Sequence, residues 1–110
     1  MPYDQGLAER LRDCYAETEG VGEKKMFGGI AFMVGGHMSC GVVRDTLMVR
    51  VGPDRYESAL ARPHAREMDF TGRAMKGFVY VSPDGFESDD DLNQWVELSL
   101  QFVSTLPPKR

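Results

Sequence analysis

The sequence has 110 residues, a length that suits one domain, which we place at residues 1–110. Hydrophobic residues make up 42% and charged residues 27%, as in ordinary globular proteins, and the net charge of −4 argues against nonspecific nucleic-acid binding. The N-terminus lacks the basic region and apolar run of a signal peptide, and no apolar run reaches the ~18 residues that a membrane span needs. The two cysteines are expected to stay reduced, so the sequence predicts a cytoplasmic protein without a membrane partner.

The first predicted element is a helix over residues 4–17. Leu7, Leu11, Cys14 and Tyr15 share one helical face, and Asp4 is suited to cap the N-terminus. Glycines within residues 18–23 then end the helix.

Residues 30–51 predict a three-stranded antiparallel meander. Gly35-Gly36 suits a two-residue hairpin turn, because glycine accepts the positive φ that such turns require, and Arg44-Asp45 suits a second tight turn. One face of the meander is apolar by alternation. Its predicted members are Ile30, Phe32, Val34, Met38, Cys40, Val42, Leu47, Val49 and Val51.

The other face of this meander carries Met33, Met48 and Arg50. Flexible methionines beside a cation suggest an adaptable contact surface for a protein partner or for self-association, including a homodimer. An aspartate at Met48 is then expected to weaken association and to leave the fold intact.

Further elements follow to the end of the sequence. Pro53 is expected at the first position of a helix that Pro63 stops, before a short strand at residues 68–70 and a stronger strand at residues 77–81. Residues 82–85 predict a turn. Ser88, followed by three aspartates, predicts the cap of a last helix whose apolar residues recur to Leu106. The order is α-βββ-α-ββ-α, an α+β fold.

The pair Gly28-Gly29 could in principle cradle a phosphate. A phosphate loop needs a helix after the glycines, whereas the apolar residues that follow here predict a strand. We therefore predict a bulge or a close backbone approach inside the sheet.

The cysteines and histidines offer two further sites. Cys14, His37, Cys40 and His64 lack the spacing of a zinc site, so no metal and no cofactor is predicted. Cys40 could act as a nucleophile with His64 and Asp69, but its place on the inward face favours a buried thiol without a catalytic role.

Basic residues allow a weaker alternative, a nucleic-acid-binding domain. Its candidate contacts are Lys24, Lys25, Arg73 and Lys76. Arg73 and Lys76 could instead contact a small ligand or a partner, together with the loop between Gly72 and Gly77, or belong to a solvated loop without such a role.

Three segments resemble the TfoX N-terminal domain family (TfoX/Sxy). They are Met26-Phe27-Gly28-Gly29, the strand from Leu47 to Val51, and the loop Gly72-Arg73-Ala74-Met75-Lys76-Gly77. The resemblance spans about Glu9 to Pro108 and implies an antiparallel sheet with helices, like that of secretion chaperones.

The resemblance also bears on function. The best-known members join this domain to a C-terminal domain and regulate genes for DNA-uptake competence, and the family offers no catalytic residue to transfer. We expect a stand-alone N-terminal domain that is a noncatalytic regulatory or protein-interaction module. The alternatives are a weak nucleic-acid binder, or a ligand-binding protein or enzyme centred on Cys40 and the loop between Gly72 and Gly77.

Overall fold

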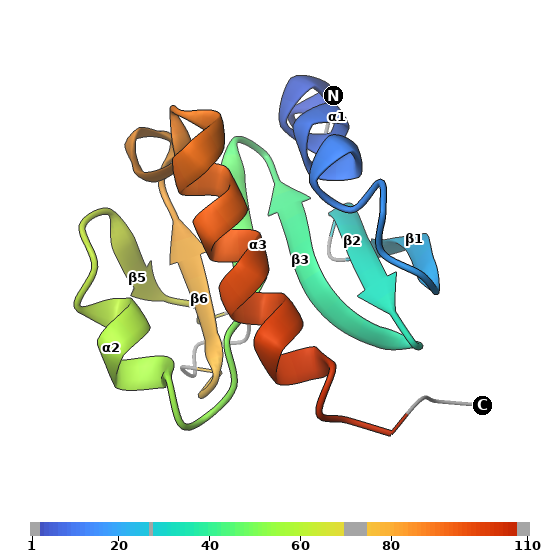
Figure 1. The fold of residues 1–110 in the computed structure, drawn as a ribbon. Helices are drawn as coiled ribbons and strands as arrows, with labels where there is room; N and C mark the ends of the chain where they lie inside the picture. The colour runs from blue at the N-terminus through green and yellow to red at the C-terminus, as the bar shows by residue number, and fades with distance from the viewer. Residues whose placement is uncertain (1–2, 27, 70–74, 108–110) are drawn as a thin grey trace.

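The computed structural model describes residues 3–26, 28–69 and 75–107. Within them, helices pack against an antiparallel sheet, which confirms the predicted α+β class (Figure 1). The elements are α1 (Gln5–Cys14), β1 (Val21–Met26), β2 (Gly29–Val34), β3 (His37–Val43), β4 (Thr46–Arg50), α2 (Tyr56–Leu60), β5 (Ala65–Glu67), β6 (Phe78–Val81), the 3₁₀ helix η1 (Pro83–Phe86) and α3 (Asp89–Val103).

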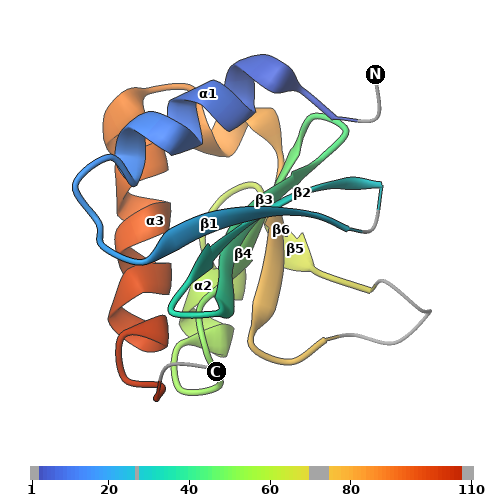
Figure 2. The same cartoon turned by 90° about the vertical axis from the view of Figure 1, so that its right-hand side faces the viewer.

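The described strands form one sheet in the order β1-β2-β3-β4-β6-β5, with antiparallel neighbours throughout. A side view places α1 and α3 on the same side of this sheet (Figure 2). None of the described helices is long and apolar enough to cross a membrane.

Local chemistry sets several of these boundaries as predicted. The carboxylate of Asp4 accepts a hydrogen bond from the Leu7 N–H at 3.2 Å, and the hydroxyl of Ser88 accepts one from the Asp91 N–H at 3.0 Å. Each contact satisfies a donor that the first helical turn leaves unpaired. Gly35 and Gly36 both have positive φ, 59° and 84°, as the hairpin turn between β2 and β3 requires.

Strand β1 is an element that sequence reasoning missed. Its four central residues are all exposed, so no apolar alternation marks it as a strand. Glu23, Lys24 and Lys25 lie on this outer edge, where charges discourage pairing with another chain. The predicted order therefore lacked one strand.

Downstream boundaries also differ from the prediction. Helix α2 begins at Tyr56 rather than at Pro53, and the short strand is β5 rather than residues 68–70, of which Phe70 lies outside the described residues. The predicted turn at residues 82–85 continues into η1, and α3 ends at Val103, before Leu106. Prolines and glycines mark that an element ends nearby, but not at which residue.

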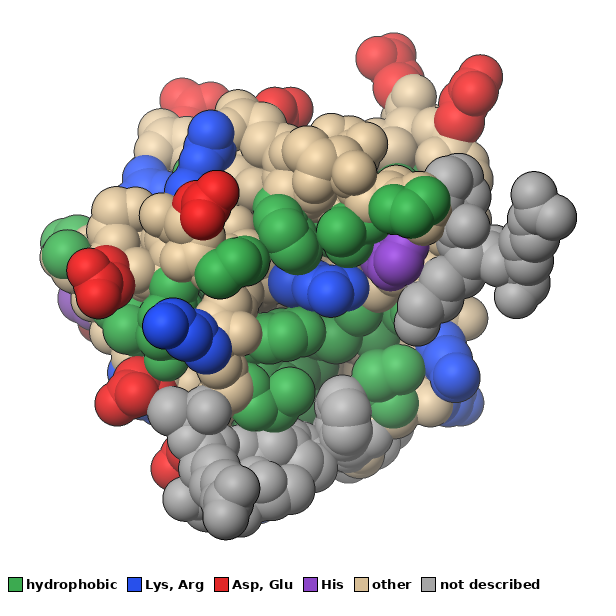
Figure 3. All heavy atoms as spheres, turned by 90° about the horizontal axis from the view of Figure 1, so that it is seen from below, with side chains coloured by type: hydrophobic (Ala, Val, Ile, Leu, Met, Phe, Trp, Pro, Cys, Tyr) green, Lys and Arg blue, Asp and Glu red, His purple; other side chains and the backbone are tan. Residues whose placement is uncertain are grey.

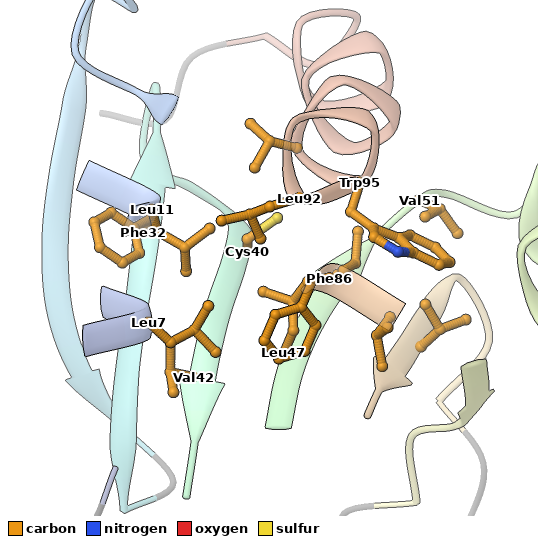
Figure 4. Packing of buried hydrophobic residues seen from close by; sticks show 14 of the residues in the cluster. Leu7, Leu11, Phe32, Cys40, Val42, Leu47, Val51, Phe86, Leu92 and Trp95 are labelled. Atoms are coloured by element: carbon orange, nitrogen blue, oxygen red, sulfur yellow. The ribbon is translucent and has the colours of Figure 1, made fainter. Parts of the chain in front are cut away.

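The main core lies between the sheet and helices α1 and α3. Figure 4 shows Leu7 and Leu11 of α1 and Leu92 and Trp95 of α3 directed toward the strands. Each of these four side chains is at most 3% exposed. Burial of this kind stabilises by about 1.5–3 kcal/mol for each large apolar side chain.

A register shift between β2 and β3 changes which residues face this core. Phe32 is opposite Cys40, but Met33 is opposite Met38, so Ser39 has no partner in the ladder. The extra residue turns Met38 to the side of Met33, and Met38 is absent from the core cluster. The prediction that Met38 shares a face with Cys40 is therefore wrong, because alternation does not survive a bulge.

Candidate functional site

The face of the sheet opposite α1 and α3 is closed at its centre. Ala31, Met48 and Met68 are each 0% exposed, yet none belongs to the main core cluster. A Cβ atom on Gly41 would lie 2.7 Å from the terminal methyl of Met48, so Met48 packs over the glycine backbone. The expectation that Met48 lies on an open contact surface is wrong, because this face has a small buried layer of its own.

Arg50 lies at the edge of that layer, at the end of β4. Its guanidinium carbon is 5.4 Å from the centre of the Phe78 ring and 5.3 Å from the centre of the Phe102 ring. Phe78 is its partner on β6, whereas Phe102 comes from the last turn of α3. Burial lowers the pKa of Arg50, but an arginine remains charged at neutral pH.

Gly52 provides the space for the Phe102 ring. A Cβ atom on Gly52 would lie 2.3 Å from Cδ1 of Phe102, so the ring rests on the backbone there. Gly52 also has a φ of 84°, a conformation that other residues rarely adopt. The N–H groups of Val51 and Gly52 both donate to the carbonyl of Gly77, at 2.8 and 3.1 Å, and so hold this segment beside β6.

Arg50 differs from the other arginines that contact aromatic rings. Each of those also donates a hydrogen bond to an oxygen of the protein. They are Arg10, to the Phe86 carbonyl at 2.8 Å, Arg62, to Gln94 at 2.8 Å, and Arg66, to Ser82 at 3.0 Å. The guanidinium of Arg50 contacts two rings, but among the described residues it has no hydrogen-bond acceptor and no ion-pair partner.

Partly exposed apolar residues lie at the same end of the sheet as Arg50. Strands β2 and β4 end, and β3 and β6 begin, at the same end of the sheet, near the last turn of α3. Figure 3 looks onto this end, where hydrophobic side chains gather around a basic one. We call this region the Arg50 surface and define it by the partly exposed residues at this end of the sheet, namely Met33, Met38, Arg50, Met75, Phe78, Phe102 and Leu106.

Of the contact residues predicted from the sequence, the structure therefore brings Met33 and Arg50 to one surface. Lys76 is exposed and follows Met75 of this surface in the sequence, and Arg73 lies outside the described residues. The sequence named Arg50 but missed Phe78 and Phe102, because Phe102 is distant in the chain and no local pattern links the two.

The glycine motif has a structural role, as predicted. A Cβ atom on Gly29 would lie 1.9 Å from the Val42 carbonyl oxygen, which confirms a close backbone approach. Gly28, with a φ of 74°, lies between β1, which ends at Met26, and β2. Gly77 has a φ of 94°, while Phe27 and Gly72 lie outside the described residues.

The thiol of Cys40 is not available as a nucleophile in this fold. Cys40 is 0% exposed, and its burial raises the pKa to about 12, so the thiol is protonated at neutral pH. His64 and Asp69, its proposed partners, are both exposed. Within the described ranges, no three His, Cys, Asp or Glu side chains are grouped so that they could hold a metal ion.

A chain of buried hydroxyls next to Cys40 was also missed. Tyr15 and Ser39 hydroxyls are 2.6 Å apart, and those of Ser39 and Ser99 are 2.7 Å apart. The chain joins the end of α1, the bulge of β3 and the middle of α3. It satisfies the polar groups that the bulge places in the core, a structural role rather than a chemical one.

These buried groups predict a loss of stability at alkaline pH. Burial raises the pKa of Cys40 from its ordinary 9.0 to about 12, and also raises the pKa of Tyr15. Their stabilising contribution is complete below the pKa values of the unfolded chain and is lost as the pH rises toward the folded values. We expect the free energy of unfolding in urea to fall from about pH 9 to pH 11, and to fall less in Cys40→Ser. A stability that is constant over this range would contradict the assignment.

Comparison with known proteins bears on the family. A family model described as the TfoX N-terminal domain matches residues 13–103. The chain belongs to the TfoX N-terminal domain family. The resemblance identified from the sequence is thus confirmed. Comparison with curated proteins and with solved structures finds no match to the chain.

In this TfoX N-terminal domain, the matched residues run from the end of α1 through all of the described strands to the end of α3. They include Arg50, Phe78 and Phe102. The centre of the Arg50 surface is therefore built within the part of the chain that defines the family.

Proposed function

We propose that the protein is a noncatalytic regulatory module that acts by binding another protein through the Arg50 surface. The observation that carries the proposal is a charged guanidinium in contact with two aromatic rings, at an end of the sheet that carries partly exposed apolar residues. Aromatic residues, methionine and arginine are the types enriched where proteins meet. The buried, protonated Cys40 supports the noncatalytic part of the proposal.

Family membership supports a regulatory role related to competence. The resemblance described above implies the control of genes for DNA uptake, and a domain that recruits a protein to such a system would need an adaptable apolar surface. Self-association through the same surface would give a homodimer, which the experiment below also detects.

The test is capture of partners by the tagged protein from its native lysate, with and without nuclease, using variants matched in chemistry. Met33→Glu places a charge on the Arg50 surface. Met26→Glu places the same charge at another partly exposed methionine, at the opposite end of the sheet. We expect wild type and Met26→Glu to retain a partner after nuclease treatment, and Met33→Glu to lose it while keeping its circular dichroism spectrum.

The captured protein is then purified and mixed with each form, and the complex is measured by sedimentation. Binding of equal strength to Met33→Glu would contradict the proposal. Capture that nuclease abolishes in wild type would instead favour the nucleic-acid alternative and its exposed Lys24, Lys25 and Lys76.

A further inference from the structure

The guanidinium of Arg50 has hydrogen-bonding capacity that the described residues do not use. A guanidinium carries five N–H donors in a planar fork, and stacking against rings occupies its faces rather than its edges. Both rings here lie within about 6 Å, the range of a favourable cation–π contact, and they limit the orientations of the group. The fork is thus held in place before any ligand arrives, which reduces the entropy lost on binding.

The chain offers no anionic side chain to fill this fork. Ion pairs among the described residues involve Arg10 and Arg12 and not Arg50. The residues outside the described part, namely 1–2, 27, 70–74 and 108–110, include no Asp or Glu. A carboxylate that pairs with Arg50 must therefore come from a described acidic residue that moves, from the C-terminal carboxylate, or from another molecule.

The surroundings of Arg50 favour a carboxylate over a phosphate group. A carboxylate carries a single charge and matches the guanidinium fork with two parallel hydrogen bonds. A phosphate dianion loses more hydration energy on burial, and here it would meet one partly desolvated cation among apolar side chains. A carboxylate on a peptide also brings neighbouring side chains that can cover Met33, Met38 and Met75.

We propose that the Arg50 surface binds an extended segment of a partner protein in which an Asp or Glu side chain is flanked by apolar residues. The carboxylate pairs with the edge of the Arg50 guanidinium, and the flanking apolar side chains lie against the partly exposed methionines and phenylalanines. This inference rests on the proposed function and specifies the chemistry of the partner.

The experiment uses random peptides of about twelve residues displayed on phage, selected against the wild-type protein. The enriched peptides are then synthesised with amidated C-termini, so that only side-chain carboxylates remain, and their affinities are measured by fluorescence anisotropy. We expect an Asp or Glu beside apolar residues in the enriched set. We also expect Arg50→Gln, and replacement of the peptide's acid by its amide, each to weaken binding at least about tenfold.

Combining the two changes should weaken binding little further, because both remove the same contact. The matched control is Arg66→Gln. The guanidinium carbon of Arg66 also lies near a ring, 5.1 Å from the centre of Tyr80, but this side chain already donates a hydrogen bond to Ser82. The control variant should bind the peptides as wild type does. Arg50→Lys keeps the charge without the fork and should lose most of the affinity.

A measurement on the wild-type protein guards against variants that unfold. The Nε–Hε signal of Arg50 in nitrogen-resolved NMR spectra should shift when an acidic peptide is added and should not shift with its amide analogue. No such shift, or an enriched set without acids, would overturn the inference. Peptides that bind without an acidic residue but fail to bind Met33→Glu would overturn the role of the carboxylate while leaving the protein-binding function in place. Binding by a peptide with a free C-terminal acid, when its amidated form does not bind, would assign the site to a C-terminal carboxylate instead.

Discussion

The Met48→Asp variant is expected to be largely unfolded at room temperature. Met48 is 0% exposed, and its methyl group fits against the backbone of Gly41. An aspartate there would bury a charge with no partner, a change in the small class that costs more than about 4 kcal/mol. Since a domain of this size has roughly 5–15 kcal/mol of total stability, most or all of it would be lost.

Met48→Leu is the control, because a change that conserves volume in a core costs less than about 1.5 kcal/mol. Urea unfolding followed by circular dichroism measures both variants. An aspartate variant as stable as Met48→Leu would show that position 48 reaches water, contrary to the buried second layer. Because we expect Met48→Asp to unfold the protein, Met48, unlike Met33, is unsuitable for testing partner binding.

Replacing Gly29 by alanine is expected to disrupt the pairing of β2 and β3. The new Cβ would lie 1.9 Å from the Val42 carbonyl oxygen and 3.0 Å from Cγ2 of Val43. Backbone atoms of a central strand cannot move aside as a flexible side chain can, so the strands must separate. We expect a loss of about 3 kcal/mol or more, the upper range for overpacking.

Alanine variants at two other glycines distinguish this clash from a general effect of replacing glycine by alanine. Gly22 has no atom within 4 Å of its Cβ position, and Gly22→Ala on the exposed edge strand should change stability little. Gly28 is equally open but has a φ of 74°, so Gly28→Ala should cost about 1–2 kcal/mol through the backbone alone. Thermal unfolding that ranks Gly28→Ala as the most damaging of the three would refute the close approach at Gly29.

Features that depend on local chemistry were predictable from the sequence. The caps at Asp4 and Ser88 and the turn at Gly35-Gly36 each need only a short side chain or a positive φ next to the affected backbone. Strand β1 was missed because both of its faces are mostly exposed, so the sheet rather than the strand's own pattern stabilises it. The extra residue at Ser39 likewise left no local signal, and it reversed the predicted side of Met38.

The candidate site was predictable only in part. Alternation placed Met33, Met48 and Arg50 on one face, but it could not tell which of them the fold would bury. Met48 became buried because Gly41, on the neighbouring strand, leaves room for its methyl group. The aromatic contacts of Arg50 depend on where α3 ends relative to β4, which is a property of the packed molecule.

Helix α3 supplies both Ser99, the end of the buried hydroxyl chain, and Phe102, one of the two rings beside Arg50. It follows every described strand in the chain, so it leaves the ribosome after them. The hairpins of β1 to β4 are local and can pair during synthesis, whereas contacts between distant segments form later. Until α3 docks, the hydroxyl of Ser39 lacks its partner Ser99, and Arg50 lacks the ring of Phe102. A nascent chain would therefore lack the complete Arg50 surface, and the binding that we propose would be restricted to molecules whose synthesis has passed α3.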